Sequence, residues 1–436
     1  MGAEIAIKLT RSGVFYGWWV ALTSALGLFL GPIPIAIFSF GIFLKPLSAD
    51  LHAGRGAISF ARTLASVMLA LGVPLAGWLT DRFGPRKVIL PSTLLAGLIL
   101  LSINLSSARL WRLYLFYSAV GLVIAGVSPV SYSHVVTYWF DRCRGLALGV
   151  TMFGLGLGAL VMPSIAQVLI GRFGWRMAFG VIGAAILVVT LPVVAHFLKN
   201  RPEEIGLLPD GNAYPVASPP PAGYDSGFSW SEAWRDRTFW LLFCAFLLVS
   251  AGVQACLAHV SAILTDRGAA VRTAAFATSL FGGGVLFGRT GTGYLLDRFF
   301  APRIAATIFG CAAAGIGLLG MAASPELAFT AAFFIGLGLG AEVDIMAYLT
   351  SRYFGLRSFG SIYGFIFAGF GLAGGSGAYF MGAAFDGSGS YRPVLTVFCV
   401  AAFVGALLML RVGPYRYQVR TAAVDAPAGG VLPIQS

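Results

Sequence analysis

One arginine stands alone in a long apolar, glycine-rich stretch, FGGGVLFGRTGTGYLLDRFFAPR, which covers Phe281–Arg303. Arg289 is the single cation of this stretch before the charged turn Asp297-Arg298. An arginine at the centre of a membrane-spanning helix costs about 2.5–3.5 kcal/mol on insertion scales, so it usually faces a water-filled cavity and meets an anion there. Because the planar guanidinium can hold a carboxylate through two parallel hydrogen bonds, we predict that Arg289 binds the carboxylate of a small organic anion.

Two acids, Glu342 and Asp344, lie in another apolar segment. Because they are two residues apart, they point to different faces of a helix. Carboxylates inside a membrane can relay protons, so both acids are candidates for proton coupling. The alternative is structural: Asp344 pairs with Arg289, or an acid near the end of the segment pairs with Arg298 or Arg352.

His259 and Tyr132 are further candidates for substrate contact. A histidine titrates in the range that suits a proton carrier or a carboxylate partner, and a tyrosine hydroxyl can donate a hydrogen bond to a carboxylate. The alternative for His259 is a satisfied interior histidine. For Tyr132 it is simple packing, because the chain contains 35 Phe and 15 Tyr.

The composition is that of an integral membrane protein. Of 436 residues, 58% are hydrophobic and 11% are charged, whereas about 25% of the residues of a soluble domain are charged. The net charge of +12 is not gathered in a basic run or a soluble domain, which argues against a nucleic-acid partner. Five scattered cysteines without a CxxC pair argue against a disulfide framework and a metal site. We expect no enzyme, no cofactor and no ATP-driven pump, because neither HExxH nor a phosphate-binding GxxxxGK motif occurs.

Apolar segments long enough to cross a bilayer fill most of the chain, and a crossing helix takes about 20 residues. Uninterrupted apolar runs of this length exclude a membrane β-barrel. In the first segment, Gly31-Pro-Ile-Pro34 should break the helix at membrane depth. We therefore predict an all-α fold with twelve transmembrane helices at 15–44, 57–80, 88–106, 110–137, 145–171, 175–198, 238–264, 273–296, 303–323, 327–350, 358–384 and 392–412.

A polar stretch with the run Ser218-Pro219-Pro220-Pro221 separates the twelve segments into two sets of six, and its composition is typical of a linker. Loops on the side of both termini hold 18 Lys and Arg against 10 on the other side, which places both termini in the cytoplasm. Short loops without large added domains favour a bacterial inner (plasma) membrane. The sequence predicts an N-terminal six-helix bundle, a cytoplasmic linker, a C-terminal six-helix bundle and a cytoplasmic tail, over residues 1–198, 199–237, 238–412 and 413–436 respectively.

The two sets of segments repeat a motif. GWLTDRF (Gly77–Phe83) closes the second segment, and GYLLDRF (Gly293–Phe299) closes the eighth, 216 residues later. Tyr138-Trp-Phe140 after the fourth segment is echoed by Arg352-Tyr-Phe354 after the tenth. Parallel six-segment repeats around a linker are typical of a secondary transporter whose two halves rock against each other.

GWLTDRFGPRK (Gly77–Lys87) resembles the cytoplasmic loop signature of the major facilitator superfamily, and the resemblance covers essentially the whole chain. Three further features, YGWWV at Tyr16–Val20, Trp139-Phe140 with the glycines that follow, and RPEEIGL at Arg201–Leu207, are similar to the monocarboxylate transporters and oxalate/formate antiporters. The resemblance implies that the region around His259 helps to line the substrate site. It also implies a gating motif that joins the two halves at the cytoplasmic face in the outward-open state, made of Gly77, Asp81, Arg82, Gly84, Arg86, Asp297 and Arg298.

Two departures from these relatives bear on the substrate. Animal monocarboxylate transporters carry an aspartate one turn before the arginine, where this chain has Val285. Oxalate antiporters pair the arginine with a lysine of the eleventh span, and no lysine occurs between Ser358 and Ala384. One buried cation suits a monoanion better than a dianion, since each dehydrated carboxylate needs its own charged partner.

We therefore expect a secondary transporter of small monocarboxylates of the lactate and pyruvate class, working as a proton-coupled symporter. Its partners would be the monocarboxylate, protons and the lipid bilayer, without nucleic acid or an obligate protein partner. Two alternatives stay open: exchange of organic anions as in the oxalate/formate antiporters, and efflux of another small organic acid or drug.

Overall fold

The computed structural model describes residues 15–105, 109–211, 227–321 and 324–416. Within these ranges the chain is almost wholly helical, and the β-structure is one isolated antiparallel bridge between Gly227 and Gly355. The all-α prediction is confirmed. The proline run of the linker and most of the expected C-terminal tail lie outside the described residues.

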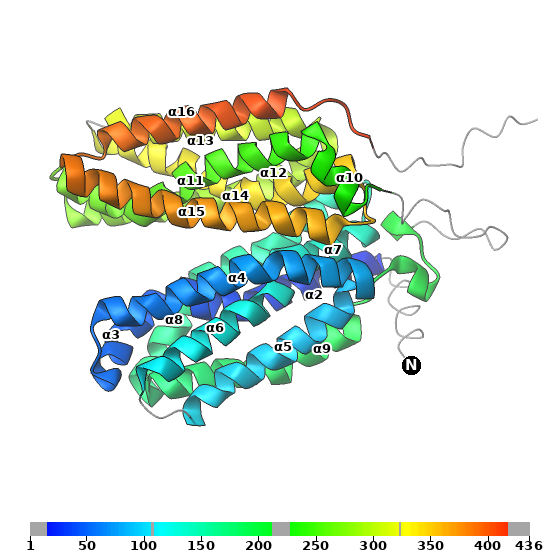
Figure 1. Ribbon diagram of the computed structural model, residues 1–436, viewed down its shortest axis with the longest axis horizontal. Helices are drawn as coiled ribbons and strands as arrows, with labels where there is room; N and C mark the ends of the chain where they lie inside the picture. The colour runs from blue at the N-terminus through cyan, green and yellow to red at the C-terminus, as the bar shows by residue number, and fades with distance from the viewer. Residues whose placement is uncertain (1–14, 106–108, 212–226, 322–323, 417–436) are drawn as a thin grey trace, which may run out of the picture.

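Two helical bundles lie side by side in Figure 1. The N-terminal bundle is formed by α2 (Tyr16–Phe29), the π-helix η1 (Pro34–Phe38), α3 (Phe40–Leu51), α4 (Arg55–Phe83), α5 (Pro85–Ser102), α6 (Leu110–Gly126), α7 (Pro129–Trp139), α8 (Arg144–Ala185), the π-helix η3 (Ile186–Thr190) and α9 (Leu191–Phe197). The C-terminal bundle is formed by α11 (Arg237–Asp266), α12 (Val271–Arg298), α13 (Ala301–Met321), α14 (Pro325–Phe354), α15 (Phe359–Ser388) and α16 (Arg392–Leu410). In the sequence, the short helix α10 (Trp230–Arg235) lies between the two bundles and belongs to the linker.

In the described ranges, ten helical stretches are long and apolar enough to cross a membrane. One of them contains α8, whose backbone breaks at Gly174 with φ 80° and ψ 166°, a conformation that glycine adopts without a Cβ clash. This break separates the predicted fifth and sixth segments. Counting both, together with the 28-residue α12, the helices fit the twelve predicted segments.

Two further segments are interrupted at prolines, because proline lacks an N–H group and cannot continue a helix without distortion. The first segment changes from α2 to η1 between Phe29 and Pro34, where the sequence predicts a break. In the fourth, α6 ends at Gly126 and α7 begins at Pro129. All eleven residues of the half-helix α7 are buried.

The linker and the described beginning and end of the chain lie at one end of the two bundles, on the right in Figure 1. We call this the linker end and the opposite end the far end. At the linker end, backbones of the two bundles nearly touch: a Cβ on Gly293 of α12 would lie 2.6 Å from the carbonyl oxygen of Gly145 of α8. A Cβ on Gly364 of α15 would lie 2.9 Å from the carbonyl oxygen of Val73 of α4.

The same two interfaces open toward the far end. Eleven residues make about three turns of an α-helix, so Gly282 lies on the side of α12 that carries Gly293, and Gly375 on the side of α15 that carries Gly364. A Cβ on Gly282 or Gly375 would meet no atom within 4 Å. The bundles are therefore closed against each other at the linker end and apart farther along.

Candidate functional site

Arg289 lies on α12 where the two bundles meet. Its side chain is 7% exposed, and a Cβ on Gly156 of α8 would lie 3.5 Å from its Cδ and Nε atoms. In the described ranges, Nε and Nη1 have no hydrogen-bond partner. A buried donor without a partner carries the full cost of its lost hydration, so these two N–H groups are strong binding points for an anion that reaches them.

Two other side chains lie near Arg289, and a third lies next to one of them. Asp344 of α14 and Tyr363 of α15 both interact with it electrostatically, and Ser133 of α7 lies beside Tyr363. We call Arg289, Asp344, Tyr363 and Ser133 the Arg289 cluster. All but Arg289 are fully buried, and the four come from four helices of both bundles.

Asp344 interacts with Arg289 electrostatically, without a hydrogen bond between the two side chains in the described ranges. Both of its carboxylate oxygens lack a hydrogen-bond partner in the part of the chain that the structure describes. Glu342 is equally buried and equally unpartnered, but it lies on the side of α14 that carries Gly338, where a Cβ would meet Ala312 of α13 at 2.7 Å. The two acids thus face different neighbours, as their spacing predicts, and Asp344 is the one beside the arginine.

The structure places His259 and Tyr132 away from this cluster. Nδ1 of His259 lies 3.2 Å from the carbonyl oxygen of Ala255, and its ring centroid lies 6.1 Å from that of Tyr391, toward the far end. Tyr132 points into the N-terminal bundle, where a Cβ on Gly27 would lie 2.5 Å from the Cζ atom of its ring. Sequence reasoning expected both near the substrate, and it did not single out Tyr363 or Ser133.

Two aspartates of the predicted gating motif join the bundles at the linker end. Asp81 at the end of α4 accepts hydrogen bonds from the backbone N–H groups of Gly360 and Ser361 at 2.7 and 2.8 Å, and from the Ser361 hydroxyl at 2.6 Å. Asp297 at the end of α12 accepts from the N–H groups of Gly145 and Leu146 at 2.6 and 2.8 Å. Each carboxylate thus caps the first turn of a helix of the other bundle, where unpaired N–H groups and the helix dipole favour a negative charge.

The cationic members of the motif stay within their own bundles. The Arg82 guanidinium lies 5.3 Å from the centroid of the Trp78 ring, and that of Arg298 lies 4.2 Å from the Tyr294 ring. The backbone N–H of Arg86 donates to the side chain of Asn200 at 2.8 Å, and its guanidinium donates to a carbonyl of α9. Gly84 holds the turn before it with φ +87°, which favours glycine.

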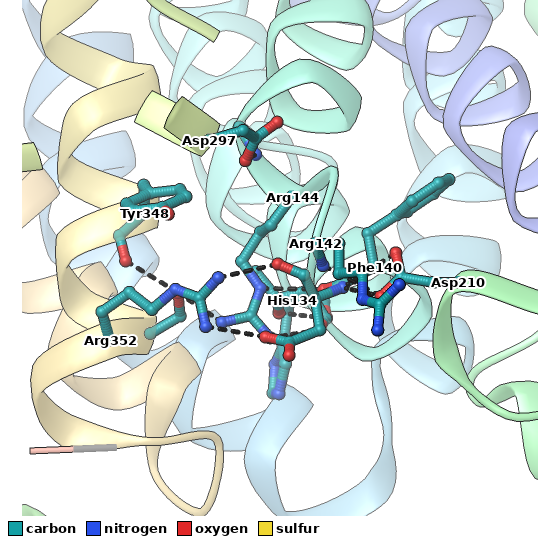
Figure 2. Close-up of polar contacts among 12 residues, drawn as sticks. His134, Phe140, Arg142, Arg144, Asp210, Asp297, Tyr348 and Arg352 are labelled. Atoms are coloured by element: carbon teal, nitrogen blue, oxygen red, sulfur yellow. Dashed lines mark hydrogen bonds and ion pairs between the residues drawn. The ribbon is translucent and has the colours of Figure 1, made fainter. Parts of the chain in front are cut away.

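A second junction between the bundles surrounds Asp141, in the turn between α7 and α8. Arg352 at the end of α14 donates from Nη1 to Asp141 Oδ1 and from Nη2 to the Asp141 carbonyl, both at 2.7 Å. Nη2 of Arg144 lies 3.4 Å from the same carboxylate, and Nη1 of Arg144 donates to the Ser351 hydroxyl at 3.1 Å (Figure 2). Arg352 therefore pairs with Asp141 rather than with an acid of its own segment.

The two ends of the linker bind the two loops that meet there. Asp210 accepts hydrogen bonds from the backbone N–H groups of Asp141 and Arg142 at 3.1 and 2.9 Å (Figure 2). On the other side, the backbone N–H of Phe228 donates to the carbonyl of Phe354 at 2.9 Å. The loops after α7 and α14, which echo each other in sequence, are thus equivalent docking points.

His134 connects α7 to Asp81. Its ring nitrogens lie 3.2 Å from the hydroxyls of Thr80 and Tyr138, and Nδ1 lies 3.8 Å from Asp81 Oδ1. It follows Ser133 directly, so α7 carries one residue of the Arg289 cluster and one neighbour of the gating aspartate. In the described ranges no three His, Cys, Asp or Glu side chains form a group that could hold a metal ion.

Comparison with known proteins agrees with this architecture. A family model described as Major Facilitator Superfamily matches residues 18–378 and 260–435. The chain is 26% identical to the oxalate:formate antiporter of Oxalobacter formigenes, covering 82% of each protein. It is 25% identical to monocarboxylate transporter 13 of Bos taurus, covering 66% of this chain and 63% of that one. The fold is similar to that of the Escherichia coli fucose:proton symporter, with a TM-score of 0.65 over 91% of this chain and 98% of the symporter at 16% identity. The chain belongs to the major facilitator superfamily of membrane transporters.

Proposed function

We propose that this transporter carries small monocarboxylates of the lactate and pyruvate class together with protons. The observation that carries the proposal is Arg289: a buried guanidinium at the junction of the two bundles, whose Nε and Nη1 find no hydrogen-bond partner among the described residues. A carboxylate supplies two acceptors in the geometry that a guanidinium matches. In the Arg289 cluster, the Ser133 hydroxyl has no hydrogen-bond partner in the described ranges, and the Tyr363 hydroxyl donates only a long bond of 3.4 Å to the carbonyl oxygen of Val343. We expect both hydroxyls to turn to further oxygen atoms of the same anion when it binds.

The balance of charge supports proton coupling. Arg289 is the one cation of the cluster, and Asp344 is its one acid. When Asp344 is ionised it already balances the arginine, so an entering carboxylate would leave an excess negative charge in a buried site, where unpaired charges are expensive. A proton on Asp344 removes that excess. The carboxylate and the proton therefore enter the cluster together, and Asp344 takes the role of the proton carrier.

Glu342 takes no direct part in this scheme. It is fully buried and has no charged neighbour that acts on it electrostatically in the described ranges. An isolated carboxyl in such surroundings stays protonated instead of exchanging its proton in each cycle. His259 and Tyr132, which lie away from the cluster, affect transport less than Arg289 and Asp344 do in this proposal.

We place the linker end, with both termini, in the cytoplasm of a plasma membrane, following the excess of Lys and Arg on that side. The closed junctions at Asp81, Asp297 and Asp141 then describe an outward-facing state. Alternating access follows when these junctions open and the bundles, residues 1–198 and 238–412, rock about Arg289. The linker 199–237 and the tail 413–436 remain cytoplasmic.

Two conservative variants in proteoliposomes test the proton step. Asp344→Asn cannot lose a proton, so we expect it to lose uptake of labelled L-lactate driven by an inward proton gradient, while exchange of lactate for lactate without a gradient continues. Glu342→Gln is the matched control and keeps both activities. Gradient-driven uptake in Asp344→Asn at the wild-type rate would contradict the role of Asp344, and wild-type exchange that ignores pH altogether would favour an organic-anion antiporter.

A further inference from the structure

A second arginine, Arg62 of α4, lies at membrane depth toward the far end. It sits within a stretch, Gly56–Phe83, that is long and apolar enough to cross a membrane. Its side chain is exposed, and in the described ranges it has no carboxylate partner. Its neighbours include the Phe40 ring of α3, whose centroid lies 5.8 Å from the guanidinium carbon, and Tyr117 of α6.

The helical position of Arg62 places it between the bundles. It lies eleven residues before Val73, or about three turns, and is therefore on the same side of α4. Val73 is the point where α4 meets α15 of the other bundle: a Cβ on Gly364 would lie 2.9 Å from its carbonyl oxygen. At the level of Arg62 the two interfaces have already opened, because a Cβ on Gly375 of α15 would meet no atom within 4 Å.

Arg62 is too far from Arg289 to serve the same bound molecule. Gly77 and Gly293 mark equivalent depths on α4 and α12, at the closed junctions. Arg62 is fifteen residues from Gly77, whereas Arg289 is four from Gly293. At ~1.5 Å per residue this difference places Arg62 about 16 Å closer to the far end, several times the length of a three-carbon acid.

Tyr117 supplies a buried polar group beside Arg62. Its side chain is 0% exposed, and its hydroxyl lacks a hydrogen-bond partner in the described ranges. The Phe40 ring packs edge-on against it, with centroids 5.5 Å apart. A buried hydroxyl left without a partner costs free energy, and beside a guanidinium it adds a second donor to the same small region.

We propose that Arg62, with Tyr117, forms an outer binding station for a carboxylate, which a substrate occupies on its way between the far end and Arg289. The identity of the anion rests on the proposed function, since a monocarboxylate is what Arg289 would receive. A fixed positive charge along the wall of an open passage raises the local concentration of anions and speeds their encounter with a deeper site. In this proposal Arg62 captures the anion from the far end, and Arg289 binds it for transport.

A substrate-independent measurement tests the placement and charge of the station. Ser66→Cys puts a reporter thiol one turn from Arg62 on the same side of α4, at an exposed position. In proteoliposomes we measure the rate at which this thiol reacts with an anionic and with a cationic methanethiosulfonate reagent. The rate of the protein without the added cysteine is subtracted from each. We expect the ratio of the anionic to the cationic rate to fall about fivefold when Arg62→Gln is added, because one nearby charge acts in opposite directions on the two reagents. Phe60→Cys, at an exposed position two residues from Arg62 and therefore about 160° away around α4, is the control and should react slowly with both.

A transport measurement tests the role. Arg62→Gln should raise the KM for labelled L-lactate about five- to tenfold with little change in kcat, and Arg62→Lys should restore most of the KM. Three outcomes would each overturn the station: a reagent ratio that does not change when Arg62 is replaced, an unreactive thiol in Ser66→Cys, or an unchanged KM in Arg62→Gln. Either of the first two would mean that Arg62 serves the lipid headgroups instead. If the wild type takes up no lactate, the proposed function fails, while the reagent ratio still decides whether the station exists.

Discussion

Removing the charge of Asp81 should open the linker end. Asp81 accepts three hydrogen bonds from the start of α15, at 2.6 to 2.8 Å. Hydrogen bonds to a charged group contribute about 1.5–3 kcal/mol each. In Asp81→Asn an amide oxygen replaces one acceptor and water reaches the freed N–H groups, so we expect a net loss of about 2 kcal/mol in the closed state. That loss corresponds to about a thirtyfold change in the ratio of closed to open molecules.

The change is measured as a distance distribution. Spin labels at Lys87 and Arg357, two exposed positions on opposite bundles at the linker end, report the separation by double electron–electron resonance. We expect Asp81→Asn to lower the population with a short distance between the labels and to raise the population with a longer one. Asp297→Asn should shift these populations less, because Asp297 accepts two hydrogen bonds instead of three. If a stably folded Asp81→Asn shows the wild-type distribution, Asp81 does not hold the bundles together and the reasoning is refuted.

Two further predictions concern the same junctions. Gly293→Ala should push α8 and α12 apart and lower the thermal stability of the closed state, since its Cβ would lie 2.6 Å from a backbone oxygen. Gly291→Ala is the control, because its Cβ would meet only the Phe287 ring, at 3.9 Å, and it should resemble the wild type in thermal stability and in the label distances. Equal effects of the two substitutions would contradict the close approach. For the Arg352–Asp141 pair, whose side chains are 13% and 21% exposed, a double-mutant cycle of Arg352→Gln and Asp141→Asn should give a coupling energy of about 1–2 kcal/mol in thermal or denaturant unfolding. A coupling of zero would mean that the pair contributes nothing to holding the bundles together.

Some of the site was predictable because single residues violate the rules of an apolar helix. Arg289 is the only cation within sixteen residues of apolar and small side chains, and that isolation alone predicts burial against another polar group. The repeated GxLxDRF motif likewise indicates that Asp81 and Asp297 hold equivalent positions. These inferences need only the local chain and the repeat, and the structure agrees with them in geometry.

The rest depends on how the two bundles meet, which no local pattern encodes. Asp141 and Arg352 are 211 residues apart, and each could have paired with several oppositely charged neighbours. Ser133 reaches the cluster because the fourth segment breaks before Pro129 and continues as α7. His259 is a candidate for substrate contact only because its region resembles a substrate-lining one, and its depth along α11 lies toward the far end.

Uptake of labelled L-lactate into proteoliposomes under an inward proton gradient, with wild type and Arg289→Gln side by side, tests the central claim most directly. The glutamine keeps hydrogen-bonding capacity but lacks the charge and the forked geometry that hold a carboxylate. We predict gradient-driven uptake by the wild type and its loss in a correctly folded Arg289→Gln. Uptake retained by the variant would contradict the claim that Arg289 binds the transported carboxylate.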